Sequence, residues 1–532
     1  MQFIVFVLVT ALVGGIAWWA SRRTPESTAD GFYLGGRSLG PWVVAGSLLL
    51  TNLSTEQIVG LNGGAYREGI LVMAWETLAA VAMVVTALFL LPRYLGGQLT
   101  TIPEFLEKRF DRQVRMWVSA LFVSGYAIIL LPIVLYSGAL AINGMFDVPA
   151  LLGMSKIGAL WVTVWALGVI GSIYAIFGGL RAVAVSDAIN AIGLLIGGLA
   201  IPILGLLMIG EGDLSSGWTT LTGALPEAFK AKGDTTSSIP FSTLFTGMML
   251  VQLFYWGTNQ AIIQRALAAR SLKAGQQGLM IAAVVKIAGP LIVVLPGIIA
   301  LYLFGPNLEG GDEAYPLLVA KVLPKWAVGF FAAVLFGAIL SSFNSALNSV
   351  ATLVGFDLYK GWVNPEANEI QSVKAGKRFA WVIALMAMTV APFLYYASKG
   401  LFDYLQEVNG FYNIPILTLI VVGYLTRKVP ARGAKVALLS GVALYGVSQF
   451  ILKPYFTETY GEHTYPHFLH VMAILFVLNV LIMLAFGWGK PAAELPESTS
   501  GAGQAAGAPW KAARWVGAAV VLVVMSTYFI FT

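Results

Sequence analysis

The chain has 532 residues, of which 58% are hydrophobic and only 11% are charged. A soluble domain carries about a quarter charged residues, so this composition excludes a water-soluble globular protein. The sequence contains no cysteine, which excludes disulfides and thiolate metal sites, and its formal net charge is +6.

Apolar runs predict an all-α polytopic membrane protein with about 14 transmembrane helices. Each run has roughly 20 residues, enough to cross a bilayer core of about 30 Å, and none alternates as the strands of a membrane barrel do. In chain order the predicted spans are 2–20, 40–65, 69–92, 115–144, 157–177, 184–210, 240–263, 277–304, 326–358, 378–397, 401–425, 434–452, 467–488 and 513–531.

The first span resembles a signal peptide in length, but Arg22 and Arg23 follow the apolar run instead of preceding it. A retained helix with its N-terminus outside fits better, and 1–24 is predicted to be a peripheral transmembrane helix. Alternate loops then collect the basic residues, as the positive-inside rule requires. Residues predicted inside include Arg93, Lys108, Arg109, Arg112, Arg115, Arg181, Arg265, Lys360, Arg378 and Lys435, whereas the opposite loops hold only a few, such as Arg67, Lys156, Lys321 and Lys399. The positive charge is therefore explained by the orientation of the chain in the membrane and does not indicate nucleic-acid binding. An even number of spans places both termini outside the plasma (inner) membrane.

Two polar stretches interrupt the apolar pattern. Residues 211–239 are predicted to form an outside loop, and 491–510, rich in Pro, Ala, Gly and Ser, a flexible inside linker that leaves the last helix free to detach. His463, His467 and His470 lie together near one loop. They are expected to form either a zinc site or, as the simpler interpretation, a cluster at the membrane interface.

Ionisable residues within membrane spans are costly and mark functional sites by default. Glu76 and Lys286 lie in two separate apolar runs and carry opposite signs. They are expected to pair, either with each other or across a polar ligand. A buried pair that only fixes helix register is the alternative.

The second and seventh spans contain clusters of uncharged polar residues, at 51–57 and 252–260, together with glycines. Irregular backbone at membrane depth survives only where it lines protein or a wet cavity, and two such helices five spans apart indicate a transporter built from inverted repeats. The second span is expected to be broken near its middle or its outer end, where Gly60, Gly63 and Gly64 follow the cluster.

The ninth span places Ser341, Ser345 and Ser349 on one helix face, with Ser342 beside them. Uncharged oxygen ligands suit an alkali cation, since divalent ions are expected to require carboxylates. The pattern therefore favours a Na⁺ or K⁺ site, with small-residue packing as the alternative.

At these residues the chain resembles the sodium–solute symporter family, and within it the bacterial sodium/galactose symporters. The resemblance rests on long ungapped motifs: STADGFYLGGRSLGPW (27–42), TNLSTEQIVG (51–60), TIPEFLEKRF (101–110), SIYAIFGGLRAV (172–183), YWGTNQAIIQRALAA (255–269) and LPGIIA (295–300). It implies a leucine-transporter-like core of two inverted five-helix repeats, at 40–211 and 240–425. Peripheral helices would fill 426–532.

The resemblance also implies roles for individual residues. Sodium would be held by Leu50, Leu53, Ala338, Ser341 and Ser342, and a second sodium by Asp187 and Ser345. The solute would contact Asn52, Gln57, Glu76, Gln252, Tyr255, Lys286 and Gln406. Leu61, Trp75 and Phe402 would form the outer gate, and Tyr255 the platform on the cytoplasmic side. Asp187 has two alternative roles, as a helix cap or as an ion-pair partner of Arg181.

The chain departs from the galactose pattern at four positions. Gln252 stands in place of Asn, Trp75 in place of Tyr, Ala79 in place of Ser and Leu61 in place of Met. The predicted function is sodium-driven symport of a sugar such as galactose or glucose, with Na⁺ as the coupling ion and no enzymatic activity. The nearest alternative is a symporter of another solute, namely inositol, an amino acid, a nucleoside or a sialic acid. Two further alternatives are a passive channel and a membrane enzyme or sensor. The oligomeric state stays open.

Overall fold

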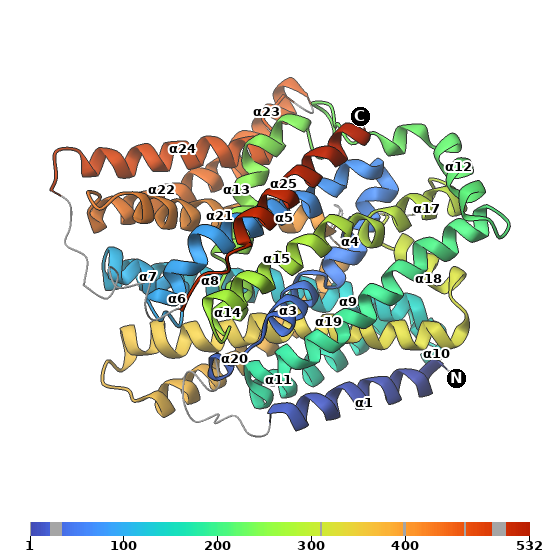
Figure 1. Ribbon diagram of the computed structural model, residues 1–532, viewed down its shortest axis with the longest axis horizontal. Coiled ribbons are helices and arrows are strands. Elements are labelled where there is room, and N and C mark those ends of the chain that lie inside the picture. The colour runs from blue at the N-terminus through green and yellow to red at the C-terminus, as the bar shows by residue number, and fades with distance from the viewer. Residues whose placement is uncertain are drawn as a thin grey trace.

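The computed structural model is a bundle of long helices that run side by side (Figure 1). It describes residues 2–21, 34–308, 311–396, 401–461, 464–491 and 507–531, with the side chains of 20, 21, 176–182 and 401 left out. Within these ranges the chain is almost entirely helical and forms two isolated β-bridges but no strand.

The first half of the chain, up to residue 229, forms helices α1 to α12 with short 3₁₀ and π segments between them. They are α1 (Gln2–Ser21), η1 (Gly35–Arg37), α3 (Pro41–Asn52), α4 (Thr55–Glu68), η2 (Gly69–Met73), α5 (Ala74–Val85), η3 (Thr86–Leu90), α6 (Leu91–Gly96), α7 (Ile102–Arg109), α8 (Arg112–Gly125), η4 (Tyr126–Leu130), α9 (Leu131–Phe146), α10 (Val148–Leu152), α11 (Lys156–Ile209), α12 (Leu214–Ala224) and η5 (Pro226–Phe229).

The second half forms helices α13 to α25 in the same manner. They are η6 (Phe241–Phe245), α13 (Gly247–Gly257), α14 (Gln260–Leu267), α15 (Leu272–Ala288), α16 (Pro290–Val293), α17 (Leu295–Phe304), α18 (Ala314–Val322), α19 (Lys325–Thr352), η7 (Leu353–Val363), α20 (Glu369–Val390), η8 (Ala391–Tyr396), α21 (Leu401–Leu425), α22 (Ala431–Val447), η9 (Ser448–Leu452), α23 (Lys453–Tyr460), α24 (Phe468–Gly487) and α25 (Ala513–Ile530).

Eleven helices of the described residues are long and apolar enough to cross a membrane, or 12 if one bent pair counts as a span. The chain is thus a multi-span membrane protein, but the predicted count of about 14 is not confirmed. The predicted spans at 40–65 and 240–263 are each divided into two helices, of 12 and 14 residues and of 11 and 8 residues. None of these four pieces crosses a bilayer core by itself.

Both polar-rich spans are broken, as predicted. The first break lies at Leu53 and Ser54, and the second lies at Thr258 and Asn259. The first break therefore lies near the middle of the span, one of the two predicted positions, whereas Gly60, Gly63 and Gly64, which were expected to weaken the helix, all lie inside α4. Glycine serves close packing there: a Cβ at Gly60 would lie 2.7 Å from the Phe402 Cβ on α21.

Proline explains several irregular turns within the spans. The π segments η3, η4 and η9 each precede a helix with proline in its first turn, at Pro92, Pro132 and Pro454. Proline lacks an amide hydrogen and its ring clashes with the carbonyl four residues earlier, so a wider turn forms ahead of it. Pro290 likewise follows the 47° bend that ends α15.

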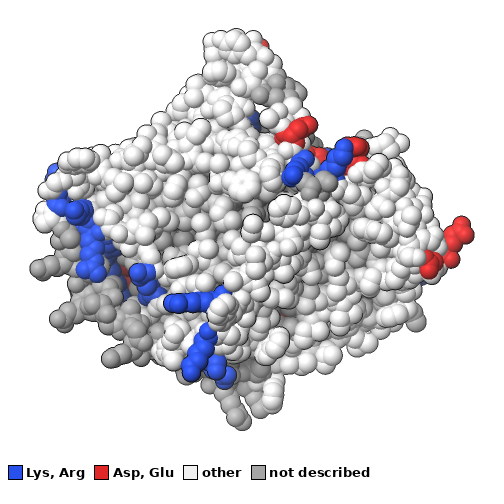
Figure 2. All heavy atoms as spheres, turned by 45° about the horizontal axis from the view of Figure 1, so that its top comes forward, with Lys and Arg blue, Asp and Glu red and all other residues white. Residues whose placement is uncertain are grey.

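The two ends of the bundle differ in charge. Both chain termini lie toward the right-hand end in Figure 1. In Figure 2, which keeps the same horizontal axis, lysines and arginines gather toward the left and acidic residues lie mainly toward the right. Arg265 does not belong to this surface, since it is completely buried in the core, and Arg109 is buried too. Arg22, Arg23 and Lys399, and the side chain of Arg181, fall outside the described residues.

The last helix packs on the core, so the detachment that the linker was expected to allow is not seen. α25 lies against α5 and α15, and the hydroxyls of Thr77 and Tyr528 are 2.9 Å apart. The backbone amide of Trp510 also donates to the Gln276 side chain at 2.7 Å. Residues 492–506 of the predicted linker lie outside the described part of the chain.

Gly297 permits the closest approach between α17 and α4. Its amide donates to the Asn62 side chain at 2.8 Å, and a Cβ there would lie 2.9 Å from the Ala65 Cβ and closer still to the Asn62 carbonyl oxygen. We therefore expect Gly297→Ala to reduce stability by about 1–3 kcal/mol, as overpacking does, measured as a lower Tm in detergent. Gly15→Ala on α1, where a Cβ would meet nothing within 4 Å, should leave Tm unchanged or raise it slightly.

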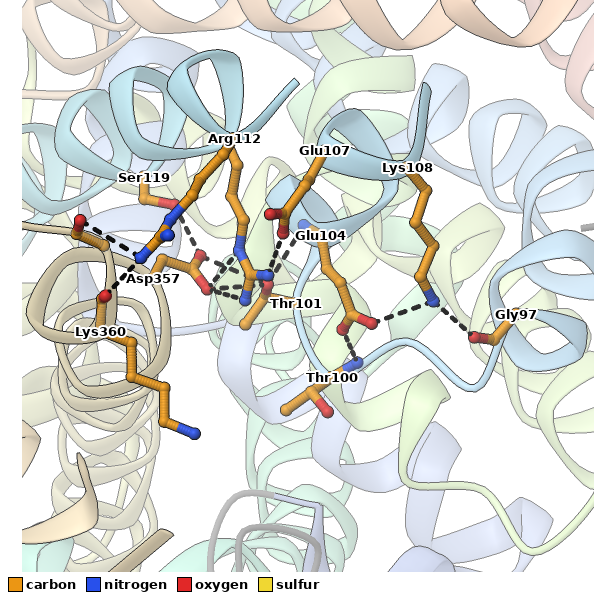
Figure 3. Close-up of polar contacts among 12 residues, drawn as sticks. Gly97, Thr100, Thr101, Glu104, Glu107, Lys108, Arg112, Ser119, Asp357 and Lys360 are labelled. Atoms are coloured by element: carbon orange, nitrogen blue, oxygen red, sulfur yellow. Dashed lines mark hydrogen bonds and ion pairs between the residues drawn. The ribbon is translucent and has the colours of Figure 1, made fainter. Parts of the chain in front are cut away.

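A polar network joins α7, α8 and η7 (Figure 3). Asp357 is buried and accepts from the Ser119 hydroxyl at 2.6 Å and from the Arg115 Nε at 2.9 Å. Arg115 also pairs with Glu107. Arg115 and Ser119 on α8 therefore tie the second half of the chain to the first through Asp357, and Glu107 of the motif at 101–110 holds Arg115 in place.

Ser119→Ala is expected to lower stability by about 1–3 kcal/mol, because it removes the hydrogen bond that the Ser119 hydroxyl donates to one oxygen of the buried Asp357 carboxylate. Thermal unfolding of the purified protein measures this effect. Ser526→Ala is the control, since the Ser526 hydroxyl is exposed and donates within its own helix to Leu522. Equal Tm values for the two variants would show that the Ser119 contact contributes nothing.

Candidate functional site

The predicted ionisable pair forms at the centre of the bundle. The Lys286 ammonium lies 2.7 Å from both carboxylate oxygens of Glu76, and both side chains are fully buried. The Gln57 amide nitrogen donates to the same carboxylate at 2.8 Å. Gly289 allows this approach, because a Cβ there would lie 3.2 Å from the Glu76 Cδ and collide with Oε2. Three predicted solute residues from α4, α5 and α15 thus make one polar cluster.

The predicted outer gate residues are packed together beside this cluster. The rings of Trp75 and Phe402 meet edge to face, with centroids 5.3 Å apart. Leu61 is buried as well. The Gln252 amide donates to the Trp75 carbonyl at 2.8 Å, so Gln252 holds the backbone of a gate residue.

A narrow cavity of about 60 Å³ lies next to Gln57. Tyr255 and Gln406 line it together with Gln57, which brings residues of three elements to one space. Asn52 lies near, hydrogen-bonded to the Tyr255 hydroxyl, and among the described residues its own side-chain oxygen has no partner. Ligand pockets usually measure 300–1,000 Å³, so this cavity must widen before it accepts a sugar-sized solute.

Several polar residues that line the cavity were not predicted for the site. They are Glu56, Tyr126, Asn259, Asn409, Tyr412 and Asn413. Gln406, Asn409 and Asn413 follow each other at helical spacing on α21, and that periodicity could have identified the last two. Tyr126 gives no such signal, because its contact with Asn259 at 2.8 Å joins residues far apart in the chain.

The predicted sodium ligands lie where α3 ends beside α19. The Ser342 hydroxyl donates to the Thr51 carbonyl at 2.7 Å, and the hydroxyls of Ser341 and Thr51 are 3.2 Å apart. The Leu53 carbonyl is released from helical bonding, since the Gln57 amide donates to Ser54 instead. Leu50 lies in the last turn of α3 and Ala338 one turn before the serines. Uncharged oxygens at a broken helix fit a monovalent cation.

The residues predicted for a second sodium surround a buried arginine. The Ser47 hydroxyl donates to Asp187 at 2.7 Å and accepts from the Arg265 Nε at 3.1 Å. Another guanidinium nitrogen of Arg265 donates to the Ser345 hydroxyl. Asp187 and Ser345 are thus joined through a permanent cation. The alternative pairing of Asp187 with Arg181 involves a side chain outside the described residues.

His467 and His470, the two histidines in the described part of the chain, contact different groups. His470 contacts the hydroxyls of Ser242 at 3.0 Å and Thr246 at 3.2 Å, and His467 accepts from the Leu469 amide at the start of α24. No group of three or more metal-ligating side chains occurs among these residues. His463 lies outside them.

Comparison with known proteins places this geometry in a family. The family model described as "Sodium:solute symporter family" matches residues 32–441. The chain belongs to the sodium:solute symporter family. Among relatives, "Uncharacterized symporter YidK" of Escherichia coli is 43% identical over 99% of this chain and 90% of its own length. "Sodium/glucose cotransporter" of Vibrio parahaemolyticus is 31% identical over 83% of this chain and 84% of its own.

A solved structure of a Na⁺-coupled sialic acid symporter, in a substrate-bound outward-open state, matches the fold with a TM-score of 0.75. It is 21% identical and covers 93% of this chain and 99% of its own. The fold is therefore of the leucine-transporter-like kind. The protein is a membrane transporter of small solutes and not an enzyme, and its coupling ion is sodium.

Proposed function

We propose that this symporter carries a sugar such as galactose or glucose together with sodium. The observation that supports the proposal best is the buried cluster of Gln57, Glu76 and Lys286, which offers amide, carboxylate and ammonium groups to ring hydroxyls. A solute that lacks one hydroxyl would leave one of these buried groups unpaired, at a cost of about 1–3 kcal/mol. The site therefore discriminates between sugars by their hydroxyl pattern.

The solute is bound between the outer gate and the inner platform. Trp75 and Phe402 close one side, and Tyr255 closes the other, where Gln406 and Gln57 line the remaining cavity. Opening of the outer side requires α21 to move relative to α4 and α5, because Phe402 lies on α21. Alternating access then proceeds by rocking of the repeats at 40–211 and 240–425 around the site.

Sodium couples to this movement by joining two elements. Ser341 and Ser342 on α19 hold the ion together with the carbonyls of Leu50, Leu53 and Ala338. Bound sodium favours the arrangement that accepts the solute. One inward charge yields about 2.3 kcal/mol per 100 mV, and a tenfold sodium gradient adds about 1.4 kcal/mol. Together, about 3.7 kcal/mol sustain sugar accumulation of roughly several hundredfold at one-to-one coupling.

We infer the orientation from the charge of the two ends. The basic end of the bundle faces the cytoplasm, and both termini lie outside the plasma (inner) membrane, in line with the positive-inside rule. This orientation puts Trp75 and Phe402 on the outer side and the network around Asp357 on the cytoplasmic side.

The test is uptake into proteoliposomes of labelled galactose and glucose, with and without an inward sodium gradient. Uptake that depends on sodium and is lost in Gln406→Ala supports sugar symport. A sodium-dependent rise in Tm without uptake of either sugar would support sodium binding but contradict sugar as the solute. Inositol and sialic acid would then be the next solutes to test. Uptake indifferent to sodium would point to a passive carrier.

A further inference from the structure

A second, larger pocket lies on the other side of α21 from the proposed solute site. It measures about 580 Å³ and is lined by residues of α21, η9 and α23. Glu407 belongs to its wall, whereas the preceding residue, Gln406, lines the narrow solute cavity. The proposed transport cycle makes no use of this pocket.

The pocket contains a buried acceptor without a donor. Gln449 is 8% exposed, and among the described residues its side-chain oxygen has no hydrogen-bond partner. Its amide nitrogen makes one long contact, of 3.4 Å, with Ser448. Rotation about the terminal torsion, which is broad for an amide, turns the oxygen toward the pocket. Gln449 lies on the π segment η9, and such segments are frequent at functional sites.

The charges around the pocket define what it accepts. Lys453 pairs with Glu407, and Glu458 also lines the wall. Two carboxylates and one ammonium leave a net negative charge, which disfavours an anionic ligand. Together with the Gln449 oxygen, they provide acceptors for a hydrogen-bonding ammonium and one donor for a phosphate.

The position of the pocket points to the lipid phase. Phe450 forms part of the wall, is 73% exposed, and stacks on Phe411 with centroids 5.8 Å apart. Tyr455 and Tyr460 on α23 and Tyr396 on η8 are exposed as well. Exposed tyrosines mark the headgroup level of a bilayer, so the polar groups of the pocket lie at the depth of lipid headgroups.

We propose that this pocket binds a phospholipid whose headgroup carries a primary ammonium, as phosphoethanolamine does. The ammonium donates to Gln449 and the carboxylates, the phosphate accepts from Lys453, and the acyl chains run past Phe450. A trimethylated headgroup has no hydrogen to donate to Gln449. Because Glu407 and Gln406 are adjacent on α21, the bound lipid contacts the helix that carries the gate residue Phe402.

Native mass spectrometry of the purified protein with equal amounts of phosphatidylethanolamine, phosphatidylcholine and phosphatidylglycerol tests this proposal. The unmodified protein is expected to retain the ethanolamine lipid in excess, and Gln449→Leu and Lys453→Gln are each expected to reduce that retention roughly fivefold. Lys453→Arg and Gln449→Glu should preserve it. Lys230→Gln removes an exposed charge that is not part of the pocket lining and serves as the control.

Equal retention of all three lipids, or an excess of phosphatidylglycerol, would overturn the proposal. Unchanged retention of the ethanolamine lipid in both Gln449→Leu and Lys453→Gln, or an equal reduction in Lys230→Gln, would contradict the headgroup contacts as well. The measurement does not depend on which solute is transported, so it is independent of the sugar proposal.

Discussion

Lys286→Ala is expected to abolish sodium-driven sugar uptake and to destabilise the protein by about 3–5 kcal/mol. The physical reason is that Glu76 is fully buried and would lose the cationic partner of its carboxyl group. Thermal unfolding and proteoliposome uptake measure the two effects separately. Lys273→Ala, an exposed lysine on the same helix, is the matched control and should change neither.

A double variant separates stability from transport. Lys286→Met with Glu76→Gln removes both charges at similar volume, and replacement of a buried pair by uncharged groups is often neutral for stability. We expect Tm to recover while uptake stays absent, because the solute loses its charged partners. Recovery of uptake in the double variant would show that the pair serves only to position α5 and α15.

Ser342→Ala is expected to shift the sodium dependence of uptake to higher sodium concentrations. The hydroxyl contacts the Thr51 carbonyl at the end of α3 and is one of the oxygens proposed to hold the ion. Loss of one ligand from so small a site should reduce the apparent sodium affinity at least about tenfold, which corresponds to about 1.4 kcal/mol. Uptake over a range of sodium concentrations, and the sodium-induced rise in Tm, measure this change.

Ser349→Ala is the control for this prediction. It removes a hydroxyl from the same face of α19, but that hydroxyl donates to Gln264 and is not part of the proposed ion site. An unchanged sodium dependence in Ser342→Ala, or an equal loss in Ser349→Ala, would contradict the proposed ligand set.

Much of the fold follows from polar residues in apolar spans. The clusters at 51–57 and 252–260 correctly predicted two broken helices, since lipid cannot satisfy so many polar groups. The first break lies near the middle of its span, one of the two positions predicted, but glycine does not cause it. The break instead comes where side chains such as Ser342 compete for the backbone carbonyls, and that partner lies 291 residues away.

The candidate site was predicted unevenly for a similar reason. Glu76 and Lys286 stand out because each is a single charge in an apolar run, and the structure pairs them as expected. Arg265 was assigned to a loop, since its acceptors Ser47 and Ser345 come from other helices and are invisible in the local sequence. The contact between Tyr126 and Asn259 likewise forms only when helices pack.

The buried guanidinium of Arg265 has an electrical consequence. It already places a fixed positive charge between Asp187 and Ser345, the residues considered for a second sodium. Another cation there would meet repulsion in a medium of low dielectric constant. We therefore expect one elementary charge to enter with each solute molecule. The reversal potential of the transport current, followed against the solute gradient in vesicles, reads that ratio directly, and a ratio of two would mean that Arg265 leaves its hydroxyl partners during the cycle.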